Sequence, residues 1–71
     1  MTPARLTTIA RTLHGERFQT ALAHDLGVSE RTVRRWVAGT SPIPLGVEEE
    51  LRGLLRARAG EIRGLLVVEE K

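Results

Sequence analysis

The sequence contains no cysteine, only one phenylalanine and one tryptophan as aromatic residues, and no long hydrophobic run. Without cysteine, the chain has neither disulfides nor a thiolate metal site to stabilise it. The longest fully apolar run is Leu65 to Val68, which is far too short to cross a bilayer, and the N-terminus has no signal-peptide core. We therefore expect a cytoplasmic protein with no membrane partner.

The length of 71 residues allows one small domain, spanning 1–71. A chain of this size buries roughly 60% of its unfolded surface, so its single core is thin. With no covalent staples, good helix packing or oligomerisation has to supply the stability. The content of 41% hydrophobic and 28% charged residues is typical of a globular chain rather than a disordered one.

The net charge of +2 is unevenly distributed along the chain. Residues 1–47 carry a net charge of +3, whereas residues 48–71 carry −1. A modest basic bias in the first two thirds is compatible with a polyanionic partner.

Apolar spacing predicts three short helices in the first 39 residues. Residues 3–13 carry a helical stripe made of Leu6, Ile9, Ala10 and Leu13. Thr2 is a favourable N-cap for this helix, and Gly15 is a plausible end. The next helix is expected over 17–26, and a third follows the N-cap Ser29 and ends before Gly39.

The prolines of the segment 41–44 predict a short rigid connection to a longer C-terminal helix. Glycines within that helix each cost about 1 kcal/mol relative to alanine, so we expect fraying or a break near Gly60 to Gly64. The tail 65–71 continues the helix or runs extended. The chain is therefore expected to be all-α, as a compact bundle of four to five helices.

Residues 19–38 have the pattern of a helix-turn-helix. Ala23 is small where two helices must cross closely, and Gly27 tolerates the turn between them. In the second helix, Val33, Trp36 and Val37 recur at the spacing of a buried face. The opposite face carries Arg31, Arg34, Arg35 and Ala38.

This stretch resembles the helix-turn-helix of the Cro/C1-type (lambda-repressor-like) DNA-binding family. The match is ungapped over twenty residues, and the hallmark positions are Gln19, Ala23, Gly27, Val33 and Trp36. The flanking helices suit the helical bundle of that family. The length and the PIP segment are similar to small phage and mobile-element regulators, including anti-CRISPR-associated repressors.

The resemblance implies binding to double-stranded DNA through the major groove. Carried over to this sequence, it implies Glu30, Arg31 and Arg35 as base readers and Arg34 as a base or phosphate contact. It further implies phosphate contacts from Gln19, Ser29 and Thr32. Family members often read bases with Gln or Asn, whereas this chain has three arginines on the helix. Because arginine pairs with guanine, these residues favour G-rich half-sites.

A dimer would bind two half-sites about 34–36 Å apart in an inverted-repeat operator. The C-terminal segment 45–71 has an apolar stripe for this purpose, and the expected interface residues are Leu51, Leu54, Leu55, Ile62, Leu65 and Leu66. No second domain is available to sense a ligand, so we expect no small-molecule effector. These features together predict a homodimeric transcriptional regulator, in the simplest case an autorepressor.

Two other functions stay open at the level of sequence. The chain could be an antitoxin or adaptor that binds a protein through its C-terminal segment, or it could coat DNA without sequence preference. Enzymatic activity is not expected, because no nucleophile, base and orienting group occur together. We also expect no cofactor and no metal, since His14, His24 and Asp25 lack a ligand spacing.

Overall fold

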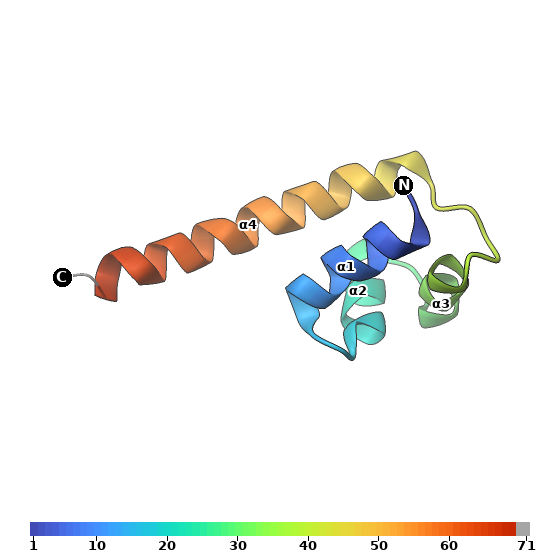
Figure 1. Ribbon diagram of the computed structural model, residues 1–71, viewed down its shortest axis with the longest axis horizontal. Coiled ribbons are helices and arrows are strands. Elements are labelled where there is room, and N and C mark those ends of the chain that lie inside the picture. Colours follow the sequence, from blue (N-terminus) through green and yellow to red (C-terminus); the bar gives the residue numbers. More distant parts are fainter. Residues whose placement is uncertain (70–71) are drawn as a thin grey trace.

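The protein, described here over residues 1–69 by a computed structural model, consists of four α-helices (Figure 1). These are α1 (Pro3–His14), α2 (Phe18–Leu26), α3 (Glu30–Ala38) and α4 (Leu45–Glu69). No strand occurs within the described residues. The prediction of an all-α bundle of four to five helices is therefore confirmed.

The helix starts predicted from the sequence are present with their caps. The Thr2 hydroxyl oxygen accepts a hydrogen bond of 3.1 Å from the Arg5 backbone N–H at the start of α1. Ser29 does the same for the Thr32 N–H at the start of α3, also at 3.1 Å. Each cap satisfies a backbone donor that has no partner inside its own helix.

The helices α2 and α3 both end on a glycine in the left-handed conformation. Gly27 has φ 66° and ψ 33°, and Gly39 has φ 78° and ψ 13°. At the first of these ends, the Val28 N–H donates to the Ala23 carbonyl and the Gly27 N–H donates to the His24 carbonyl. This pair of bonds closes the helix and turns the chain directly into α3.

The core lies where α1 meets the other three helices. Trp36 and Val33 of α3 are buried, with exposed fractions of 5% and 0%. The remaining core residues are Leu6, Ile9, Ala10, Leu13, Phe18, Leu22, Ala23, Val47 and Leu51. Burial of Ala23 confirms that a small residue occupies the close contact between α2 and its neighbours.

Only the first half of α4 belongs to this bundle, and the second half extends away from it (Figure 1). Val47 and Leu51 are buried in the core, and Leu54 and Leu55 are partly buried against it. Leu51 is 0% exposed, so its expected place in a dimer interface is wrong: its side chain packs on its own chain. By contrast, Ile62, Leu65 and Leu66 are at least half exposed.

The expected break near Gly60 to Gly64 is also wrong. α4 is continuous over 25 residues from Leu45 to Glu69. The flanking Leu, Arg, Glu and Ala side chains favour helix, and the cost of isolated glycines, about 1 kcal/mol each, is too small to end it. The tail is thus helical to Glu69, and residues 70–71 lie outside the described part of the chain.

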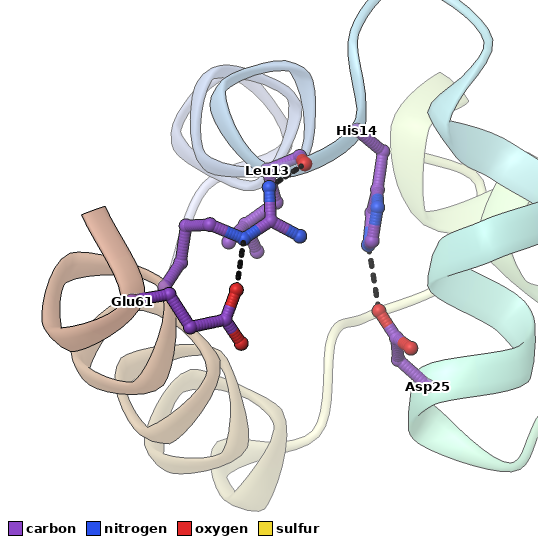
Figure 2. Close-up of polar contacts among 5 residues, drawn as sticks. Leu13, His14, Asp25 and Glu61 are labelled. Atoms are coloured by element: carbon purple, nitrogen blue, oxygen red, sulfur yellow. Dashed lines mark hydrogen bonds and ion pairs between the residues drawn. The ribbon is translucent and has the colours of Figure 1, made fainter. Parts of the chain in front are cut away.

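Arg58 marks the point at which α4 leaves the bundle. Its Nη1 donates a hydrogen bond of 2.9 Å to the Leu13 carbonyl, and its Nε lies 3.7 Å from a carboxylate oxygen of Glu61 (Figure 2). Leu13 is in the last turn of α1, where carbonyl groups lack intrahelical donors. A cation at this helix end also interacts favourably with the helix dipole.

A second polar contact joins α1 to α2 at the same end of α1. The Nε2 atom of His14 lies 2.6 Å from Oδ2 of Asp25 (Figure 2). His14 is the last residue of α1, and Asp25 lies in the last turn of α2. The end of α1 is therefore tied to α4 on one side and to α2 on the other.

Two glycine-to-alanine substitutions should have opposite effects on stability. A Cβ at either Gly27 or Gly53 would meet no atom within 4 Å, so the backbone conformation alone decides the outcome. Gly27→Ala should lower the free energy of unfolding by about 1–2 kcal/mol, because an L-residue resists the left-handed region. Gly53→Ala should raise it by about 0.5–1 kcal/mol, because alanine is the better residue inside a helix. Urea denaturation followed by circular dichroism measures both, and equal signs would contradict this assignment of the turn.

Candidate nucleic-acid interface

The two faces of α3 differ sharply. Val33 and Trp36 point into the core and Val37 is partly buried against it, as the sequence pattern predicted. Arg31, Arg34, Arg35 and Ala38 are all exposed on the other face. A helix of only nine residues therefore has one side fixed to the bundle and a basic side directed to solvent.

The three arginines share one open depression. Its volume is about 530 Å³, and it is lined by Arg31, Arg34, Arg35, Ala38 and Thr40. Within the described part of the chain, none of these guanidinium groups lies within 4.0 Å of a carboxylate oxygen. Three neighbouring cations without an internal counter-ion form a site suited to an anionic ligand.

Glu30 does not line this depression. It lines a second depression together with Gln19, Thr20, Arg17 and Glu16. The Thr20 hydroxyl donates a hydrogen bond of 2.6 Å to the Glu30 carboxylate, which links α2 to the start of α3. The structure therefore groups Glu30 with the first turn of α2, not with the three arginines.

The start of α2 has no side-chain cap. Arg17 occupies the N-cap position, and its side chain makes no capping hydrogen bond. The first backbone N–H groups of a helix have no carbonyl partner within it, and with the helix dipole they favour an anion. Gln19, which is partly buried, and Thr20, which is exposed, lie in this first turn.

The two hydroxyl groups expected to contact phosphates are hydrogen-bonded to each other. Ser29 Oγ lies 2.9 Å from Thr32 Oγ1, in addition to capping the helix through the Thr32 N–H. Ser29 is exposed and Thr32 is partly exposed. Both lie at the N-terminal end of α3.

Four residues that line these two depressions were not predicted from the sequence: Glu16, Arg17, Thr20 and Thr40. Thr20 directly follows Gln19 and Arg17 precedes it by two residues, so the position of the motif was a usable signal for both. Thr40 follows the glycine that ends α3, and its hydroxyl bonds to the Arg35 carbonyl at 3.3 Å. Only the folded turn brings Thr40 back beside the arginines.

The described residues contain no helix that is long and apolar enough to span a membrane. In the same part of the chain, no three His, Asp or Glu side chains gather in an arrangement able to hold a metal ion.

Comparison with known protein families, with curated proteins and with solved structures finds no match to this chain.

Substitutions on the two faces of α3 should differ strongly in their effect on stability. Trp36→Ala should lower the free energy of unfolding by about 3–5 kcal/mol, because it leaves a large cavity in a small core. The neighbouring exposed change Arg35→Ala should stay within about 0.5 kcal/mol of the parent protein. Chemical denaturation monitored by far-ultraviolet circular dichroism suits both variants, since one lacks the single tryptophan. A Trp36 variant of unchanged stability would refute the assignment of the buried face.

Proposed function

We propose that this protein binds double-stranded DNA sequence-specifically as a homodimeric transcriptional regulator of the Cro/C1 type. The observation that carries the proposal is the contrast between the exposed basic face and the buried apolar face of α3. Arg31, Arg34 and Arg35 are exposed and lack carboxylate partners in the described residues, while Val33 and Trp36 hold the opposite side of the helix. An outward helix with this division fits the major groove of B-DNA.

The chemistry of the basic face favours guanine. A guanidinium group can donate two hydrogen bonds to O6 and N7 of one guanine, a contact worth about 1–3 kcal/mol of discrimination. Arg31 and Arg35 lie one helical turn apart, so they would reach successive parts of the groove. Arg34, beside them, would contact a base or the adjacent phosphate.

The start of α2 supplies a second type of contact. Its open N–H groups, with Arg17 and Gln19, would hold a backbone phosphate beside the groove. Ser29 and Thr32 would do the same at the start of α3. Phosphate contacts of this kind set the register of the protein on the duplex but do not distinguish its sequence.

Glu30 has a revised place in this proposal. Its carboxylate accepts the Thr20 hydroxyl at 2.6 Å, so we assign it to orienting α3 against α2. It would also repel phosphates and thereby disfavour wrong registers. Direct base reading is then assigned to the three arginines.

Selection of bound sites from a pool of random duplexes tests the proposed function as a whole. The expected outcome is a two-fold symmetric motif with guanines in each half-site. Equal retention of all duplexes, with a steep dependence on salt, would show sequence-neutral coating. If no duplex is retained, the proposal of DNA binding is refuted.

Substituting one base-reading arginine should alter specificity in a local way. Arg35→Ala should weaken binding to the selected site by about 1–3 kcal/mol and relax the preference at one base pair in each half-site. Arg56→Ala removes the same charge from an exposed position on α4 and is the matched control. Fluorescence anisotropy with duplexes altered at single positions measures both. A uniform loss across all duplexes for Arg35→Ala would indicate a phosphate contact instead.

The exposed end of α4 supports a second candidate, an antitoxin or adaptor that binds another protein. Ile62, Leu65, Leu66 and Val67 are between 50% and 67% exposed, an unusual density of apolar groups for a solvated helix. This candidate makes α4, rather than α3, the functional surface.

Truncation after Gly60 distinguishes the two candidates. It removes these exposed side chains but none of the buried core residues, so the bundle should keep its helical fold. A regulator should lose dimerisation and operator affinity together, as measured by analytical ultracentrifugation and anisotropy. If the protein is an adaptor, the truncated form should lose only the binding of its protein partner.

A further inference from the structure

We infer that a second copy of this chain covers the exposed half of the α4 apolar face, with the two α4 helices antiparallel. The inference specifies the dimer and therefore rests on the proposed function. It follows from where the bundle sits on α4 and from the positions of the apolar residues beyond it.

Apolar side chains from both halves of α4 share one face of the helix. With 3.6 residues per turn, Ile62 and Leu65 fall on the same side of the helix as Val47 and Leu51. Their environments differ: Val47 and Leu51 are 6% and 0% exposed, whereas Ile62 and Leu65 are 50% and 67% exposed. The same face is thus covered by its own chain in the first half of α4 and uncovered in the second.

The bundle itself decides the direction of pairing. It lies along one side of the first half of α4 (Figure 1), and Val47 and Leu51 of α4 belong to its core. The face that carries these two residues is the one that would have to meet a partner helix. In a parallel pair, both bundles would lie between the helices at the same level and would collide. In an antiparallel pair, the bundles lie at opposite ends, and only the two exposed halves overlap.

The register follows from the positions of Ile62 and Leu65, which are exposed on this face beyond the edge of the bundle marked by Arg58. An antiparallel two-fold pair covers both residues in each copy when Ile62 of one copy faces Leu65 of the other. The centre of the pair then lies between Arg63 and Gly64. An interface of this type is self-complementary, as a two-fold dimer requires.

This arrangement changes the expected spacing of the operator. At a rise of 1.5 Å per residue, the N-terminal ends of the two α4 helices would lie about 55 Å apart along the pair. The helix α3 lies beside that end of α4, away from its C-terminus (Figure 1). The two half-sites should therefore be farther apart than the single turn of 34–36 Å typical of compact helix-turn-helix dimers.

Disulfide trapping in the absence of DNA tests the pairing, because the chain has no native cysteine. In an antiparallel pair, the flank of the apolar face that carries Ala59 and Leu66 meets the same flank of the partner. The two residues are then offset by only about 3 Å along the axis. In a parallel pair, the flank that carries Leu66 meets the opposite flank, which carries Glu61.

Three single variants, A59C, E61C and L66C, are therefore mixed in pairs and oxidised mildly. The inference predicts that A59C with L66C forms the major cross-linked dimer and that E61C with L66C forms several-fold less. The reverse preference would overturn it in favour of parallel pairing. Absence of both cross-links would overturn it as well, since disulfides require Cα atoms within about 7 Å.

A distance measurement with a label outside the interface tests the pairing without changing any interface residue. Glu49 is exposed on the far side of α4, so a nitroxide on E49C does not disturb the pairing. Antiparallel helices should place the two labels at least about 44 Å apart, from the axial separation alone. A distance below about 30 Å, or no interspin coupling at concentrations at which the parent protein sediments as a dimer, would overturn the inference. Both measurements omit DNA, so their failure is distinct from a failure of the proposed DNA binding.

Discussion

The burial of Val33 and Trp36 is the interaction on which the presentation of α3 depends. A helix of nine residues is not stable alone in water, so α3 exists because one of its faces packs into the core. That packing also determines where the opposite face points. The three arginines gain a defined direction only through the buried side chains behind them, Val33 and Trp36.

α4 also has a buried part and an exposed part, but these follow one another along the helix axis instead of lying on opposite faces. One apolar face first completes the core through Val47 and Leu51 and then continues beyond the bundle. Arg58 separates the two parts by bonding to the end of α1. The core residues and the exposed apolar residues of α4 thereby lie on one continuous helix.

Features governed by neighbouring residues were predictable, whereas features governed by distant contacts were not. The caps at Thr2 and Ser29 and the turn at Gly27 are local, because each depends on a few adjacent residues. The hydrogen bond between Thr20 and Glu30 depends on how α2 and α3 pack, so neither the spacing nor the resemblance to a known family indicated this contact of Glu30. α4 is continuous through its glycines because the cost of each isolated glycine, about 1 kcal/mol, is too small to end a helix whose other residues favour it.

The sequence by itself determined the helical class, the ends of the first three helices and the inner and outer faces of α3. Apolar periodicity and cap chemistry act over one or two turns, so they can be read along the chain. Only the tertiary structure decided how much of α4 the core would use. Leu51 and Leu65 are the same residue type on the same face, and what separates them is whether another helix lies within reach. That depends on the length of α1 and the path of the 39–44 connection, which no local pattern contains.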